Sequence, residues 1–186
     1  FGNPLAVKML ANMWRDGVAI DTIFNHPEAP ILTKGKKRLV AQLFLNSCLN
    51  EQDKQAVYAL AIMRRPEQEF LRKTLKAQDN TELHSRLQQL HYRYSFVSPD
   101  EFKLDEQYKV FIQEYLLEPE QRLSSEILDI NRQARNYFQE RLDNLIQGLS
   151  IKQQLENQEV TETISNLIHH WQWRDENEYD ENFVWN

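Results

Sequence analysis

The sequence predicts a mainly helical protein that carries one short β-hairpin. Its 186 residues include only four glycines and six prolines, which stand at the ends of apolar segments and form no runs. Within those segments, apolar residues recur every three or four positions, as on the buried face of an amphipathic helix. Residues 94–104 differ because they hold two short runs in which apolar and polar residues alternate. This pattern fits helices joined by short connections.

Three helices are predicted in the first fifty residues. The first covers residues 4–14, with Pro4 in its first turn and Gly17 just beyond its end. A short helix over 19–25 comes next, and residues 34–37 are expected to form a turn. The third helix follows this turn, and its buried side is expected to hold Leu39, Val40, Leu43, Phe44 and Cys48.

Three more helices are predicted in the next part of the chain. Asn50 is expected to cap a helix over residues 51–63, because a side-chain amide can accept a hydrogen bond from the first turn. Pro66 and Asn80 are expected to begin the other two. Their apolar positions follow helical spacing: Val57, Leu60 and Ala61, then Phe70, Leu71 and Leu75, then Leu83, Leu87 and Leu90.

The hairpin follows these helices directly. Residues 94–97 and 101–104 are the two alternating runs, and Ser98-Pro99-Asp100 between them is a typical turn sequence. Three or four helices followed by a two-stranded wing is the order of elements in a winged helix-turn-helix domain. We therefore predict a mainly α fold in which a winged helix-turn-helix with a short β-hairpin wing is flanked by helical segments.

The last third of the chain is predicted to be helical as well. A helix over residues 106–117 ends before Pro119, and a long amphipathic helix then continues until Gly148. A final helix covers residues 159–171 and leads into an acidic tail. The aromatic residues there are expected to pack in a first helical repeat or, alternatively, to mark a protein-binding segment: Trp171, Trp173, Tyr179, Phe183 and Trp185.

Composition limits the classes of function. The net charge of −6 argues against nucleic acid as the main partner, because phosphate binding needs clustered cations. No apolar stretch is long enough to span a bilayer, and the single cysteine, Cys48, suits a reducing compartment. A cytoplasmic protein without membrane contact is therefore expected. No catalytic triad is recognisable, and His169-His170 are interpreted as surface histidines that cannot chelate one metal ion from adjacent helical positions.

A short motif near the start suggests a family. The segment Gly2-Asn3-Pro4-Leu5-Ala6 resembles the Gly-x-Pro-Leu-Ala motif by which STAND-type ATPases, the NB-ARC family of signalling switches, contact a bound adenine nucleotide. Its place before a winged helix resembles most the bacterial members that carry helical repeats. The resemblance implies that residues 1–35 belong to a helical subdomain that follows a nucleotide-binding domain missing from this sequence. Residues 36–118 would then be the winged-helix domain, and 119–186 a helical linker and the start of a repeat-like region.

The resemblance also implies nucleotide contacts. Gly2 and Pro4 would lie at the nucleotide, with the rigid Pro4 ring against adenine. The family's Met-His-Asp triplet, whose His reaches the β-phosphate, is replaced by Leu104-Asp105-Glu106. Asp105 would repel a phosphate unless a cation intervened. Both residues also have a purely structural interpretation, because Pro4 suits a helix start and Asp105 suits a helix cap.

The sequence contains no phosphate-binding G-x-x-x-x-G-K-[ST] motif. The expectation is therefore a non-catalytic regulatory fragment, cut from a longer ATPase that binds ADP or ATP. No cofactor is expected in the fragment itself. Its expected partners are the missing nucleotide-binding domain and either another protein or further copies of itself.

A free-standing winged-helix DNA-binding transcriptional regulator is the alternative. A recognition helix would then enter the major groove while the wing contacts phosphates. Acidic residues are interleaved with the candidate cations, which favours a solvated face of mixed charge. The candidate DNA contacts are Arg72, Lys73, Lys76, Arg86 and Arg93.

Overall fold

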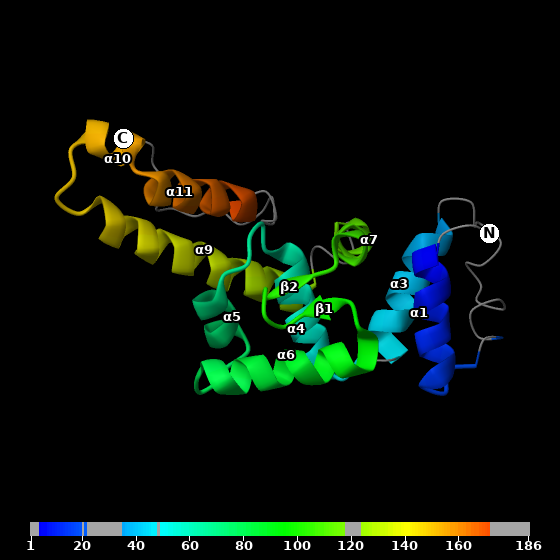
Figure 1. The fold of residues 1–186 in the computed structure, drawn as a ribbon. Helices are drawn as coiled ribbons and strands as arrows, with labels where there is room; N and C mark the ends of the chain where they lie inside the picture. Colours follow the sequence, from blue (N-terminus) through cyan, green and yellow to red (C-terminus); the bar gives the residue numbers. More distant parts are fainter. Residues whose placement is uncertain (1–3, 20, 22–34, 48, 118–123, 172–186) are drawn as a thin grey trace. The chain divides into compact units, whose positions relative to one another are not determined.

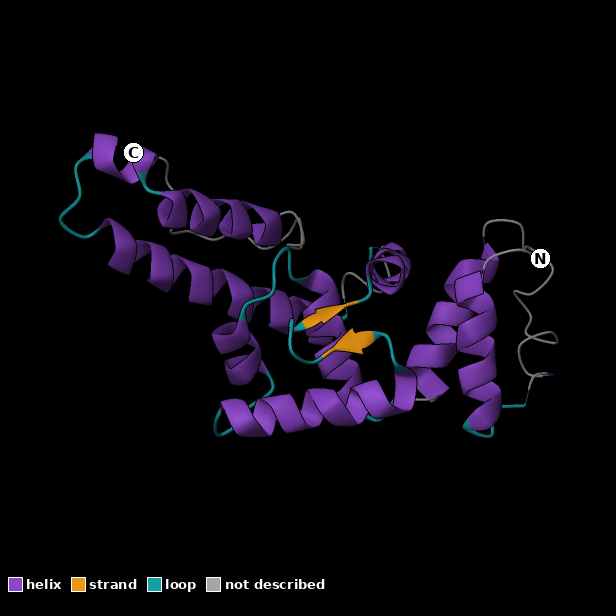
Figure 2. Cartoon of the chain, viewed as in Figure 1, coloured by secondary structure: helices purple, strands orange, loops and turns teal. Residues whose placement is uncertain are grey.

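The computed structural model is mainly helical, with one small antiparallel sheet (Figures 1 and 2). It describes residues 4–19, 21, 35–47, 49–117 and 124–171. The chain divides into two compact units, which we call unit 1 (Phe1–Glu118) and unit 2 (Pro119–Asn186). Within the described ranges, every helix is too short or too polar to cross a membrane.

Unit 1 holds six of the described helices and both strands. The hairpin pairs Val97 with Leu104 and Ser98 with Lys103. The elements of unit 1, in chain order, are α1 (Pro4–Arg15), α3 (Gly35–Ser47), α4 (Glu51–Ile62), α5 (Gln68–Thr74), α6 (Asn80–Tyr94), β1 (Val97–Ser98), β2 (Lys103–Leu104) and α7 (Glu106–Leu116). The predicted helix over 19–25 and the predicted burial of Cys48 lie outside the described residues.

The predicted turn at residues 34–37 is wrong, because α3 already begins at Gly35. Glycine is disfavoured in helix interiors. In the first turn it destabilises the helix little, because the backbone N–H groups there lack helical partners anyway. The lysines at 36 and 37 therefore belong to the helix and not to a connection before it.

The hairpin is shorter than predicted. Tyr94, expected to start a strand, is the last residue of α6, and its ring is buried. It continues the three-to-four-residue spacing set by Leu87 and Leu90, so the helix gains another buried side chain by extending this far. Ser95 then ends the helix in the left-handed region, at φ 47°, with its N–H bonded to the carbonyl of His91 at 2.7 Å.

An aromatic cluster forms part of the core of unit 1. The ring of Phe44 meets those of Tyr94 and Phe96 edge-on, at centroid distances of 5.2 and 5.6 Å. The Phe96 ring also stacks on that of Tyr108 at 4.7 Å. These rings come from α3, the end of α6, the hairpin and α7, so one cluster ties together four parts of the chain.

Helix α4 runs through the middle of this core. All seven residues from Ala56 to Ile62 are buried, so the second half of the helix is covered on every side. A helix that is apolar all round is typical of such a central position. Its first turn is polar instead, and the Asn50 side chain accepts a hydrogen bond from the Asp53 N–H at 2.8 Å, as predicted for its cap.

The end of α1 is bonded to the end of α6. Arg15 donates from Nη2 to the carbonyl of Arg93 at 2.7 Å. The hydroxyl of Tyr94 donates to Oδ2 of Asp16 at 3.0 Å. Residues 78 positions apart in the sequence are thereby held together at the exposed edge of the aromatic cluster.

Unit 2 is a helical hairpin. The long α9 (Ser125–Ile146) packs along α11 (Gln158–Trp171), and α10 (Ile151–Glu156) lies between them in the sequence (Figure 1). The two long helices were predicted, whereas α10 was not. Apart from the apolar residues, the buried positions of this hairpin include several polar side chains: Asn131, Arg135, Thr163, Asn166 and His170.

The interpretation of His169-His170 as surface histidines is wrong for His170, which is only 1% exposed. Its ring stacks on that of Phe138 at 5.5 Å, and its Nδ1 lies 3.1 Å from Oδ1 of Asn131. Burial, helped by the neighbouring His169 and Arg135, lowers the pKa of His170 from 6.5 to about 3. The imidazole is therefore neutral throughout the physiological pH range.

Candidate functional site

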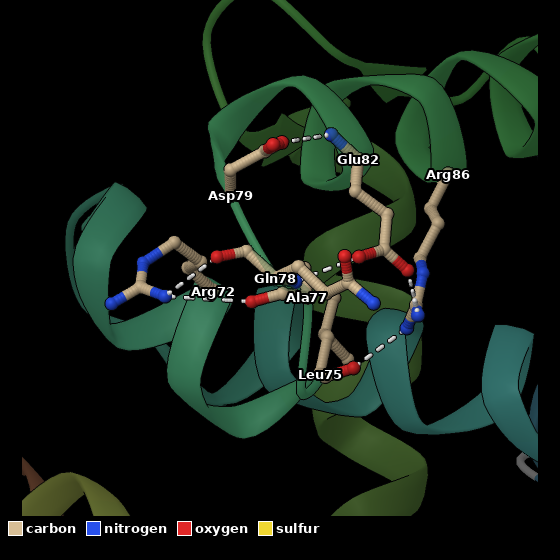
Figure 3. Close-up of polar contacts among 7 residues, drawn as sticks. All are labelled: Arg72, Leu75, Ala77, Gln78, Asp79, Glu82 and Arg86. Atoms are coloured by element: carbon tan, nitrogen blue, oxygen red, sulfur yellow. Dashed lines mark hydrogen bonds and ion pairs between the residues drawn. The ribbon is translucent and has the colours of Figure 1, made fainter.

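The turn between α5 and α6 is built from a helix end followed at once by a helix start. Leu75 and Lys76 end α5, with Lys76 at φ 52° in the left-handed region. Asp79 caps α6 by accepting a hydrogen bond from the Glu82 N–H at 2.8 Å. Glu82 reaches back and accepts one from the Gln78 N–H at 2.7 Å (Figure 3). These reciprocal bonds fix the start of α6.

Two of the candidate DNA contacts hold this turn together (Figure 3). Arg72 forms a bidentate pair with Glu69, at 2.7 and 2.9 Å, and its Nη1 also approaches the carbonyls of Ala77 and Gln78 at 3.4 Å. Arg86 donates to the carbonyl of Leu75 at 2.6 Å and pairs with Glu82. Both guanidinium groups therefore donate hydrogen bonds to carbonyls of the protein's own backbone.

These ion pairs also affect the pKa of the acidic partners. The hydrogen bond from Arg72 lowers the pKa of Glu69. The hydrogen bond from the Gln78 N–H, followed by that from Arg86, lowers the pKa of Glu82. Both carboxylates thus stay ionised, and they keep the two arginines compensated at neutral pH.

The other three candidate cations are placed differently. Arg93 pairs with Oδ2 of Asp53 at 3.0 Å, and its guanidinium lies 5.0 Å from the centre of the Tyr94 ring. Lys73 is exposed on α5. Lys76 is exposed too, and its ammonium makes no hydrogen bond or ion pair with the part of the chain that the structure describes.

A groove of about 360 Å³ lies between α4 and α6 in unit 1. Its lining comes from the first turns of α4, the α5–α6 turn and one side of α6. Lys76, Arg86 and Arg93 contribute three positive charges, against the single carboxylate of Asp53. The lining also includes neutral polar side chains and a few apolar ones: Asn50, Gln52, Gln55 and Gln89, with Ala56, Leu75 and Leu90. The structure therefore gathers three of the five candidate cations into one hollow.

Sequence reasoning missed this groove. It interpreted the cations as a solvated face of mixed charge and did not connect them with Gln52 and Asp53, which lie about forty positions before Arg93 in the chain. A partial signal was present, because Arg86 and Arg93 are seven residues apart and so share one side of a helix. Burial raises the pKa of Asp53, even though Arg93 opposes the shift.

The outward face of α6 carries no cation. Its buried side holds Leu83, Leu87, Leu90 and Tyr94, so the opposite side consists of Thr81, Ser85, Gln88 and Tyr92. Tyr92 is 81% exposed. A helix that reads DNA would be expected to bring basic side chains to this face, and here they lie along its flank instead.

Of the residues implied by the nucleotide-switch resemblance, Pro4 and Asp105 each stand at the start of a helix. Pro4 is the first residue of α1, and Gly2 lies outside the described residues. Asp105 is the N-cap of α7, where its carboxylate accepts a hydrogen bond from the Gln107 N–H at 3.0 Å. The cap that was proposed as the structural role of Asp105 is thus present.

Among the described residues, no three His, Cys, Asp or Glu side chains are grouped so that they could hold a metal ion. No protein-family model, curated protein or solved structure matches this chain.

Proposed function

We propose that unit 1 is a winged-helix regulatory domain of a nucleotide-dependent signalling switch of the STAND type. It would act through contacts with other protein domains and carry out no chemistry itself. Supporting this, α4, α5 and α6 are followed by the hairpin β1–β2 and by α7, the order of elements in a winged helix. The Gly-x-Pro-Leu-Ala segment at the start of α1 supports the choice of family.

The observation that carries the proposal is the neutral outward face of α6. Tyr92 projects from it into solvent, and tyrosine is among the residues most often found at the centre of protein interfaces. The nearest arginines, Arg86 and Arg93, are bonded to the chain itself. This arrangement favours a protein partner over the DNA of the alternative hypothesis, which requires cations free to contact phosphates.

In such a switch, nucleotide exchange would change how the winged helix contacts the nucleotide-binding domain. The two states would differ in which surface is free for oligomerisation or for a partner. The helical hairpin of unit 2 would then be the first part of a helical-repeat sensor. Asp105 would contribute to the stability of α7 and not to phosphate recognition, since its carboxylate is already used as a cap.

The direct test is a pair of titrations on the 186-residue chain. Calorimetry with ADP is expected to show no binding in the micromolar range. Fluorescence anisotropy with duplex DNA is expected to show at most weak binding. Micromolar ADP affinity, or DNA binding that falls steeply as salt is raised, would contradict the proposal.

A positive test uses the nucleotide-binding domain. The reading frame before Phe1 is expected to encode a strand followed by a P-loop. That domain, expressed separately, should bind the chain with an affinity that differs between ADP and ATP. Tyr92→Ala should weaken this binding about tenfold or more, as a buried interface tyrosine does. Val110→Ala, a matched loss of an exposed apolar side chain on α7, should leave it unchanged.

A further inference from the structure

The groove between α4 and α6 has an excess of positive charge that the fold does not need. Arg86 is compensated by Glu82, and Arg93 faces Asp53. Lys76 has no such partner among the described residues, and it lines the same groove. This charge stands out because the protein as a whole is acidic, with a net charge of −6.

The backbone at Lys76 gives an independent reason to single it out. The Lys76 N–H bonds to the Lys73 carbonyl at 3.1 Å, and the Ala77 N–H bonds to the Arg72 carbonyl at 3.0 Å. With φ at 52°, this is the Schellman end of a helix, where glycine is the usual residue in the left-handed position. A lysine here is disfavoured by its own backbone, and of the described non-glycine residues in the left-handed region, Lys76, Ser95 and Phe102, only Lys76 lines the groove.

The opposite wall of the groove is formed by the first turn of α4. The N–H groups at the start of a helix form the positive end of the helix dipole, and here the carboxylates of Glu51 and Asp53 oppose it. Asn50 satisfies the Asp53 N–H only. Amides from Gln52, Gln55 and Gln89 could orient the uncharged part of a ligand, because an amide both donates and accepts hydrogen bonds.

We propose that this groove binds a small molecule that carries a compact group with at least two negative charges, such as a phosphate ester. Lys76 supplies a positive charge that no carboxylate among the described residues compensates. Arg93 gives up its ion pair with Asp53 and binds the anion instead. The groove volume of about 360 Å³ lies in the range of small-ligand sites, so it accommodates a body larger than the charged group alone. The proposal is independent of the nucleotide switch, because it involves neither Pro4 nor Asp105.

The test follows binding of pyrophosphate to the whole chain by two-dimensional amide NMR. Saturable shifts are expected for Gln52, Lys76 and Gln89, with a dissociation constant below about 10 mM. Citrate tests whether carboxylates serve as well as phosphate, and a double-stranded oligonucleotide tests the DNA alternative. Absence of saturable shifts with both small anions, or shifts only with the oligonucleotide, would overturn the proposal.

Lys76→Gly tests the role of Lys76 in binding without destabilising the fold. Glycine suits the left-handed position, so the variant is expected to unfold at an equal or higher urea concentration than the wild type. Its affinity for pyrophosphate should nevertheless fall about tenfold or more, because a charge-assisted contact is lost. Lys73→Gln removes a nearby exposed lysine that does not line the groove, and it should change the affinity by less than about twofold.

Asp53→Asn should have the opposite effect. Removing the carboxylate that competes with the anion for Arg93 is expected to raise the affinity about threefold or more. Asp100→Asn is the matched control, since that carboxylate is 85% exposed in the hairpin turn. If Asp100→Asn strengthens binding as much as Asp53→Asn, the attraction is a diffuse surface effect and the groove is not the site.

Discussion

The two units of the molecule build their interiors from different chemistry. Among the described residues, six polar or charged side chains are buried, and five of these lie in unit 2: Asn131, Arg135, Thr163, Asn166 and His170. Unit 1 has only Thr74 in this class, and it buries a cluster of aromatic rings instead. Its described charged side chains, including those of the α5–α6 turn and the groove, are exposed or only partly buried.

Each unit is therefore sensitive to a different kind of perturbation. An apolar interior loses stability mainly when its volume or shape is changed. A polar interior loses it when a hydrogen bond is broken or when a buried group acquires a charge. Unit 1 should therefore respond to cavities and little to mild acid, whereas unit 2 should respond to protonation.

The largest expected effect comes from a cavity in unit 1. Phe44→Ala removes a fully buried ring that meets two other rings edge-on, and it should reduce the free energy of unfolding of unit 1 by about 3–5 kcal/mol. Hydrogen exchange resolved by segment would show the loss in α3, α6 and α7. Phe44→Leu, which keeps most of the volume, should cost less than about 1.5 kcal/mol. Equal loss of protection in α9 and α11 would contradict the separation of the two interiors.

The second largest expected effect is a loss of stability of unit 2 as the pH falls. The pKa of His170 is lowered from 6.5 to about 3, so between these values the unfolded chain binds a proton that the folded chain does not. Stability is therefore unaffected above pH 6.5 and falls as the pH drops below it, by about 1.4 kcal/mol per pH unit. From pH 7 to pH 5, unit 2 should lose about 2 kcal/mol.

Hydrogen exchange of α9 and α11 at the two pH values, corrected for the intrinsic exchange rate, measures this loss. His170→Gln is the control: it should be less stable than the wild type at pH 7 but should show little further loss at pH 5, because the titrating group is gone. A wild-type unit 2 that is equally protected at both values would show that the imidazole is not buried.

The smallest expected effects come from removing one helix cap in each unit. Asp79→Ala removes the cap of α6 and should cost unit 1 about 1 kcal/mol, read from its urea unfolding curve. Ser150→Ala removes the capping box of α10, a six-residue helix without buried residues, and should cost below about 0.5 kcal/mol. If the two substitutions cost the same, α10 contributes more to unit 2 than its exposure indicates.

Much of the helical architecture could be predicted from local patterns. Asn50 and the apolar spacing around Leu83 and Leu87 identify α4 and α6, because caps and periodicity are properties of neighbouring residues. The same reasoning placed a hairpin after α6. It missed α10, whose only strong signal is the capping box formed by Ser150 and Gln153, since this helix has no buried face to reveal it.

The features that escaped prediction depend on contacts between distant positions. His170 is buried because it packs against residues of α9, 39 positions away at Asn131. The Arg86 side chain donates to the carbonyl of Leu75. This carbonyl lies outside α6, so the sequence of α6 alone does not predict the contact. The groove forms only because α4 lies beside α6, and no local sequence pattern predicts that these two helices are neighbours. Sequence reasoning therefore named the candidate cations but not what each of them contacts.

The bonds between the ends of α1 and α6 have a mechanical consequence. Helix α1 has 12 residues and is therefore a stiff rod about 18 Å long. Its far end is fastened to α6 through Arg15 and through Asp16 with Tyr94. Because both contacts lie where the two helices end, an axial displacement of α1 would act directly on Arg93 and Tyr94, and Arg93 also lines the groove.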